Sequence, residues 1–236
     1  MIIFRQLKCY EKASSYQLNK LKFTKSPTEK TTAFTDILLA LAAVGAICYL
    51  QWLKSPEVWK VNTWSCAFGF IALSGFLGAI AHGLELSESV HQWVWNPLNL
   101  GLGLAVSVFV IGVAYDVWGQ TAARTILPWM VGMALGFYVI TRFFQGIFFV
   151  FILFEALALL FAGCAYGWLA FKGQLSGAWI IAMGILVSIV AAGIQATKIL
   201  AFKVIFEFDH NSIFHVIQIL GILLLLMGLR LSFLTQ

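Results

Sequence analysis

The sequence predicts an all-α membrane protein, a bundle of seven transmembrane helices, and three observations support this fold class. Hydrophobic residues make up 61% of the 236-residue chain and charged residues only 11%, whereas soluble domains carry about 25% charged residues. The apolar residues gather in long runs, each near the roughly 20 residues with which a helix crosses a bilayer. The runs lack the short alternation of membrane β-strands, and a helix satisfies its own backbone polar groups in lipid.

The chain begins with a polar, basic segment, residues 1–33, which we expect to form a tail before the transmembrane domain of residues 34–236. This tail region carries seven of the fifteen Lys and Arg residues. Basic residues beside a first span favour the cytoplasmic side, so we expect a cytoplasmic N-terminus. Because the positive charge belongs to the tail, we expect contact with membrane lipids and no binding of nucleic acid.

Seven apolar runs follow the tail, and each is predicted to be one span. They lie near residues 35–53, 63–83, 94–115, 125–141, 145–171, 177–198 and 212–233. Tryptophans stand at or near the ends of these runs, where an indole ring prefers the membrane interface. The connections are short, so neighbouring spans should pack antiparallel.

Alternation of seven antiparallel spans brings all four histidines to the membrane face that carries the N-terminus. His82 ends the second run, His91 precedes the third, and His210 and His215 begin the seventh. Polar residues within or beside spans are costly to bury and often functional. The other candidates on this basis are Asp36, Ser74, Glu85, Asn99, Glu155, Asn211 and Gln218.

The spacing of these polar residues indicates which of them share a helix face. Asn211, His215 and Gln218 recur at helical spacing on the seventh run, and Ser74 lies about two turns deeper than His82 on the second. Glu155 stands alone near the middle of the fifth run. Asp36 follows Thr35 at the expected start of the first span, where it is either an N-cap or a site residue.

The histidines suggest a metal site. Three neutral imidazoles and a water are a typical ligand set of catalytic zinc. His82 and His215 would be ligands, with His210 or His91 as the third, and Asp209 or Glu85 could orient one imidazole. The alternative is that these interfacial histidines only hydrogen-bond headgroups, water or loop carbonyls.

This pattern resembles the CREST superfamily of seven-span membrane proteins, which includes alkaline ceramidases and progestin and adipoQ receptors. The resemblance implies a zinc ion held by three histidines and hydrolysis of lipid amides. His82 stands at the position of the family's second-span histidine, and His215 at that of the later histidine in the seventh span. Three further positions differ in residue type: Gly78 stands where the family has Ser, and Asn211 stands where it has His. Near the third span, Asn96 and Asn99 are found where the family has Asp. The layout also resembles uncharacterised bacterial seven-span proteins.

Two functions are therefore open. The first is a metal-dependent membrane hydrolase acting on a lipid amide or ester, in which Ser74 or Asn99 stabilises the oxyanion. The second is a non-enzymatic transport, sensor or assembly protein whose polar cluster binds a small ligand or a partner. In that case Glu155 should matter more than the histidines. The last run contains no Lys, so a retinal Schiff base is not expected there.

Overall fold

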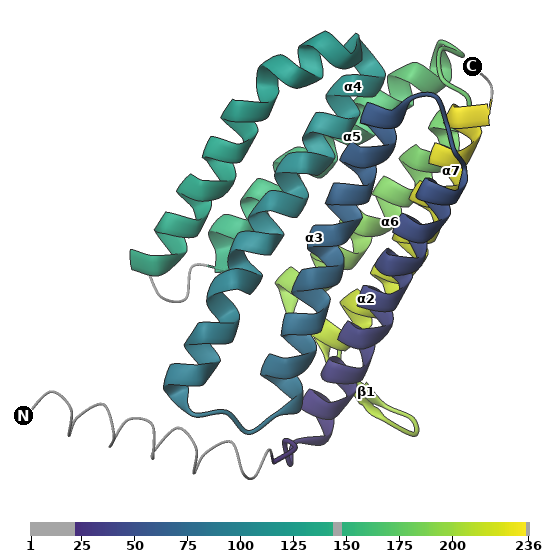
Figure 1. Cartoon of the computed structure of the whole chain (residues 1–236). Coiled ribbons are helices and arrows are strands. Elements are labelled where there is room, and N and C mark those ends of the chain that lie inside the picture. Colours follow the sequence, from purple (N-terminus) through teal and green to yellow (C-terminus); the bar gives the residue numbers. More distant parts are fainter. Residues whose placement is uncertain (1–21, 144–147, 235–236) are drawn as a thin grey trace, which may run out of the picture.

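The computed structural model describes residues 22–143 and 148–234, and it forms a bundle of long helices (Figure 1). The helices are α2 (Pro27–Trp52), α3 (Val58–Gly83), α4 (Glu88–Phe143), α5 (Phe148–Phe171), α6 (Ala178–Thr197) and α7 (His210–Leu234). Two short antiparallel strands, β1 (Phe202–Lys203) and β2 (Glu207–Phe208), form a hairpin between α6 and α7. The prediction of an all-α fold is confirmed.

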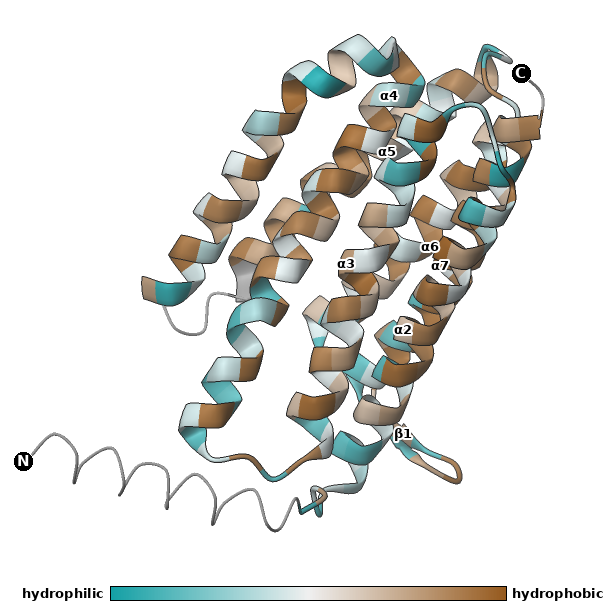
Figure 2. Ribbon diagram, in the orientation of Figure 1, coloured by the Kyte–Doolittle hydropathy of each residue, from teal (hydrophilic) through white to brown (hydrophobic). Residues whose placement is uncertain are grey.

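Within the described residues, six helices are long and apolar enough to cross a membrane. Figure 2 shows hydrophobic residues along the bodies of the helices and hydrophilic ones gathered towards the helix ends. Large apolar side chains such as Leu41, Leu157 and Leu223 are exposed on the outside of the bundle. A water-soluble protein rarely exposes so much apolar surface, so this arrangement is that of a multi-pass membrane protein.

Helix α4 contains a reversal of chain direction at Gly119. Its backbone there has φ 83° and ψ 177°, and this non-helical residue separates two helices that join end to end. A positive φ favours glycine, which has no Cβ to clash with the backbone. Figure 1 shows the two arms running in opposite directions. The predicted third and fourth spans, 94–115 and 125–141, fall one on each arm.

Helix α2 begins at Pro27 rather than near residue 35. The Ser26 side chain accepts a hydrogen bond from the Glu29 N–H, and Pro27 stands in the first turn, where its missing N–H costs little. Asp36 consequently lies well inside the helix, and its interpretation as an N-cap is wrong. The expected tail falls mostly on residues 1–21, which lie outside the described residues.

The helices pack in a consistent order around a shared core. Helix α2 packs against α3 and α7, α3 packs against α4, and α5 and α7 both pack against α6. The main core includes the fully buried side chains of Leu50, Trp64, Tyr166, Ile181 and Ile222. A smaller core cluster, which includes Val106, Phe137 and Phe151, connects the two arms of α4 to α5.

Candidate functional site

A cavity of about 500 Å³ lies inside the bundle and is lined by residues of all six helices. It extends from the middle of the bundle to the end that carries the β1–β2 hairpin. Every predicted site residue except Glu85 and His91 lines this cavity. They are Asp36, Ser74, His82, Asn99, Glu155, His210, Asn211, His215 and Gln218. Glu85 is exposed, and its N–H donates to the carbonyl of Lys22 at 2.8 Å.

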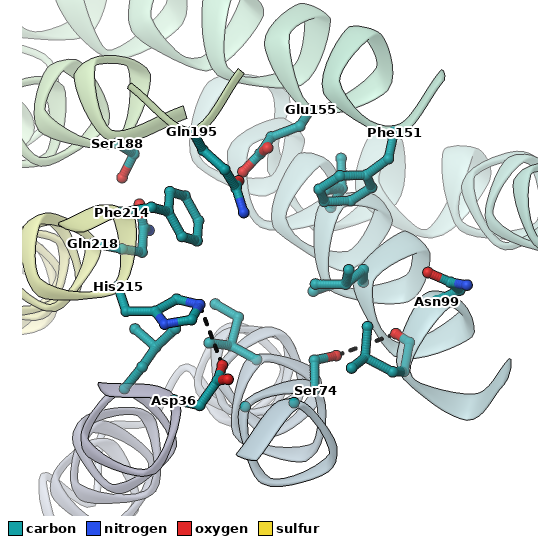
Figure 3. Close-up of a pocket in the computed structure, with 18 of the residues that line it drawn as sticks. Asp36, Ser74, Asn99, Phe151, Glu155, Ser188, Gln195, Phe214, His215 and Gln218 are labelled. Carbon is teal, nitrogen blue, oxygen red and sulfur yellow. Dashed lines mark hydrogen bonds and ion pairs between the residues drawn. The ribbon is translucent and has the colours of Figure 1, made fainter. Parts of the chain in front are cut away.

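Asp36 of α2 and His215 of α7 form a buried pair on one wall of the cavity (Figure 3). His215 Nε2 lies 3.2 Å from Asp36 Oδ1, and His215 Nδ1 lies 3.0 Å from the hydroxyl of Thr35. The two groups form an ion pair when the imidazole is protonated, and their contact joins α7 to α2.

Gly78 of α3 makes the room that Asp36 needs. A Cβ atom at Gly78 would lie 2.8 Å from Asp36 Oδ1 and 2.9 Å from Oδ2. Such a contact is closer than real Cβ atoms approach, so any larger residue would displace the carboxylate. Gly78 thus has a direct steric role in this chain.

Three buried polar atoms of cavity-lining residues have no hydrogen-bond partner among the described residues. They are Asp36 Oδ2, Trp64 Nε1 and Gln218 Oε1. Buried polar groups in proteins are almost always hydrogen-bonded, because an unpaired one loses its interaction with water without replacement. All three atoms are themselves buried in the cavity wall.

Glu155 of α5 lies on the opposite wall, where Figure 3 shows it directed into the same pocket as Gln195 and Phe214. Within the described part of the chain, its carboxyl group has no hydrogen-bond or ion-pair partner. Gln195 is engaged elsewhere, since its amide donates to Asn211 Oδ1 at 3.2 Å and ties α6 to α7. The acidic group of Glu155 is thus available to a molecule inside the cavity.

The predicted oxyanion residues do not converge on one point. Ser74 donates its hydroxyl hydrogen to the carbonyl of Leu98 at 3.4 Å and thereby joins α3 to α4. A Cβ at Gly101 would lie 2.7 Å from the Ser74 oxygen, so glycine is required there for this approach. Figure 3 shows Asn99 on the opposite side of the pocket from His215.

The histidines, as they lie, do not fit a three-histidine zinc site. His82 Nδ1 is 2.6 Å from Glu29 Oε2, and His91 Nε2 accepts from Trp95 Nε1 at 2.9 Å. Both ring nitrogens of His215 are also engaged. No group of three His, Cys, Asp or Glu side chains among the described residues is placed to hold a metal ion. One ring nitrogen of His82, one of His91 and both of His215 thus serve contacts between side chains.

Asp209, just before α7, fixes the start of that helix beside the cavity. Its carboxylate accepts hydrogen bonds from the Ser212 N–H at 2.9 Å and the Thr32 hydroxyl at 3.0 Å. Partial burial alone would raise the pKa of Asp209, but the hydrogen bonds from Ser212 and Thr32 outweigh it and hold the pKa below its ordinary value. Asp209 thereby orients the first two turns of α7, which carry His210 and His215.

A second polar cluster, at the opposite end of the bundle, was not predicted from the sequence. Lys60 Nζ lies 2.8 Å from Asp116 Oδ1, and Asp116 Oδ2 accepts from the Tyr166 hydroxyl at 2.6 Å. Lys60 also donates to Ser232 Oγ at 3.0 Å and is only 1% exposed. The available signal was an acid and a base just outside two apolar runs, which is equally typical of two separate loop charges.

Comparisons with known proteins place the chain in a family without assigning it an activity. A protein family described as a family of unknown function (DUF6962) matches residues 31–232. The match spans all the described helices except their outermost ends. No curated protein and no solved structure matches the chain.

Proposed function

The chain belongs to this family of unknown function, and we propose that it is a non-enzymatic membrane protein that binds a small ligand inside its bundle for transport or sensing. The observation that carries the proposal is the cavity of about 500 Å³, which polar side chains from all six helices line. A cavity of this size suits a small organic molecule. Empty cavities that persist in proteins are apolar, whereas polar side chains such as Glu155, Gln195 and Asn211 line this one.

The geometry favours this function over the zinc-dependent hydrolase. A catalytic zinc needs three ring nitrogens free to converge on the metal, and the nitrogens of His215 already contact Thr35 and Asp36. A hydrolase would also need an oxyanion donor near the attacking water, but Ser74 is engaged with Leu98. The hydrolase remains a prediction from the histidine pattern and the resemblance.

We also propose that the helices cross the membrane seven times, with the N-terminus in the cytoplasm. The two arms of α4 run in opposite directions from Gly119, and both are rich in apolar residues. Each arm then makes one crossing, and the cavity opens on the side that carries the N-terminus. The basic residues before α2 support a cytoplasmic location of this side.

Cysteine accessibility tests whether the cavity takes up molecules from water. In a background with Cys9, Cys48, Cys66 and Cys164 replaced by alanine, Gln218→Cys places a thiol in the cavity, and Leu220→Cys places one on the outer face, where Leu220 is 51% exposed. The purified variants are reconstituted in liposomes and treated with a charged, membrane-impermeant thiosulfonate. Because a charged reagent does not enter lipid, we expect Gln218→Cys to react at least roughly tenfold faster than Leu220→Cys.

The two cysteine positions lie on the same helix and at similar depth, so the comparison separates an aqueous cavity from general exposure. Reaction of Gln218→Cys should occur from the side of the β1–β2 hairpin. Equal and slow reaction of both variants from both sides of the membrane would show that the cavity is closed to water-soluble molecules. That result would rule out the proposed uptake of a ligand from this side.

A further inference from the structure

The polar cluster around Lys60 and Asp116 lies beyond the floor of the cavity, towards the far end of the bundle, the end opposite the hairpin. On α3, α4, α5 and α7, the lining residues nearest the far end are Trp64, Phe109, Leu159 and Leu225. The same four helices supply the cluster, which consists of Lys60, Asp116, Tyr166 and Ser232. Lys60 stands four residues nearer the far end than Trp64, and the other three stand seven residues nearer than their counterparts. Side chains at these spacings share one helix face, so the faces that line the cavity continue into the cluster.

Two aromatic rings meet at the floor of the cavity. Trp64 and Phe109 lie edge to face with their ring centroids 5.7 Å apart. Trp64 also packs closely on α4, because a Cβ at Gly112 would lie 2.8 Å from its ring. A molecule moving from the cavity towards the far end would meet these rings first and the ion pair next.

The cluster joins four helices at one point and continues towards the surface. Lys60 and Asp116 have side chains that are 1% exposed, and their contact at 2.8 Å connects α3 to α4. Tyr166 and Ser232 add α5 and α7 to it. Lys60 Nζ also lies 3.5 Å from Glu57 Oε2, and the Glu57 side chain is 17% exposed. Charged groups thus extend from the buried pair to the water at this end.

A buried ion pair closes such a path reversibly. Apolar residues of similar volume would hold the helices together at least as firmly, because desolvation offsets much of the attraction between buried charges. Charged groups regain their hydration when helices separate and water enters, whereas apolar side chains would lose their burial. A charged pair at this position therefore favours a bundle that opens and closes at the far end over one that stays shut there.

We propose that the protein carries its ligand across the membrane, and that the Lys60–Asp116 cluster is the gate that closes the far end while the mouth at the hairpin end is open. This inference rests on the proposed ligand-binding function and selects transport over sensing. In the second arrangement, Lys60 and Asp116 separate and meet water, and the helices close at the mouth instead. Transporters move a ligand through a central site that opens to each side of the membrane in turn.

The reaction of Gln218→Cys from each side of the membrane tests the gate. The variant, with the native cysteines replaced, is placed in liposomes of known orientation, and the impermeant thiosulfonate is applied to one side at a time. We expect fast reaction from the mouth side and slower, measurable reaction from the far side. Lys60→Met leaves the charge of Asp116 unpaired and favours the arrangement in which water reaches it, so the far-side rate should rise at least about fivefold.

Lys60→Met/Asp116→Asn should have the opposite effect. Without charges, the cluster gains less from hydration and the closed far end is favoured, so the far-side rate should fall at least about fivefold. In both variants the mouth-side rate should change in the opposite direction to the far-side rate, because the two ends open in turn. Lys203→Met is the matched control, since it breaks an exposed pair in the hairpin and should change neither rate. A parallel rise of both rates in both cluster variants would show general loosening of the bundle and would overturn the proposal.

The two proposals fail in different ways. If Gln218→Cys reacts from neither side, the ligand-binding function itself is wrong. If it reacts from the mouth side alone in the native background and in both cluster variants, the cavity still binds ligands but the gate and the transport are wrong. If Lys60→Met does not fold, the double variant decides, and a far-side rate equal to that of the native background would contradict the gate.

Discussion

The ion pair between Lys60 and Asp116 is buried at the end of the bundle opposite the mouth of the cavity. Each side chain is 1% exposed, and the two charged atoms lie 2.8 Å apart. Asp116 also accepts a hydrogen bond from the Tyr166 hydroxyl, and Lys60 donates one to the Ser232 hydroxyl. Removing one member of such a pair leaves an unpaired buried charge, which destabilises a protein more than removing both members.

We therefore predict that Lys60→Met lowers the free energy of unfolding by about 3 kcal/mol and that Lys60→Met/Asp116→Asn recovers most of the loss. Thermal unfolding in detergent measures both variants. Lys203→Met is the control, because Lys203 and Glu207 form an exposed pair in the hairpin, and its loss should change stability by less than about 1 kcal/mol. A double variant as unstable as Lys60→Met would contradict this account.

The sequence identified cavity residues one by one but not their partners. His82, His215 and Glu155 could be predicted because a polar residue beside or within an apolar run must be paired or functional. The contact of His215 with Thr35 joins residues 180 positions apart, and only the packing of α7 against α2 determines it. Asp36 was misplaced because the helix start signal at Ser26 and Pro27 lies within a polar segment that has the composition of a tail.

At the scale of elements, the close approach of α6 to α7 depends on glycine. A Cβ at Gly184 would lie 3.0 Å from the Gly221 carbonyl oxygen and 3.0 Å from the Leu225 nitrogen. Both of these are backbone atoms, which cannot move aside as a flexible side chain would. Small residues allow such contacts where lipid supplies no hydrophobic force between helices.

Gly184→Ala should therefore push α6 away from α7 and destabilise the fold by about 1–3 kcal/mol, the range for overpacking. Gly136→Ala is the matched control, because Gly136 lies within α4 and a methyl group added there would meet nothing within 4 Å. Alanine is the better helix former, so this change should leave stability equal or slightly higher. Thermal unfolding compares the two, and equal melting temperatures would show that the α6–α7 contact tolerates a methyl group.

Most helices could be predicted from apolar runs, but the connections could not. Between the third and fourth runs the chain was expected to leave the helix, whereas α4 stays helical on both sides of Gly119. Hydropathy predicts which residues lie in lipid, but it does not predict at which residue the hydrogen bonding of a helix ends. The β1–β2 hairpin was likewise unexpected. Its rings of Phe202 and Phe208 stack with their centroids 5.2 Å apart, and this contact forms only once the chain has turned back on itself.

At the scale of the whole molecule, the alternation of spans predicted which ends of the helices meet. His82, His210 and His215 do line one cavity, whereas His91 hydrogen-bonds Trp95 within its own helix. The alternation predicts at which membrane face each helix ends, but it does not predict how the helix is rotated about its own axis. Rotation depends on side-chain packing, so the sequence could bring histidines to one face without saying which rings turn inward.

The number of crossings decides on which side each connection lies. Seven crossings place residue 87 and the β1–β2 hairpin on the side of the N-terminus, and residues 121 and 174 on the other side with the C-terminus. In the cysteine-free background, Ser87→Cys, Thr121→Cys, Gln174→Cys and Val204→Cys present thiols at exposed positions. We expect an impermeant maleimide applied outside sealed vesicles to label one of two pairs, according to the orientation of the protein. One pair is Ser87→Cys and Val204→Cys, and the other is Thr121→Cys and Gln174→Cys.

If α4 did not cross twice, Thr121→Cys would be labelled together with Ser87→Cys. The arms would then lie along one membrane surface, and the cavity, which both arms help to line, could not be a site within the bilayer.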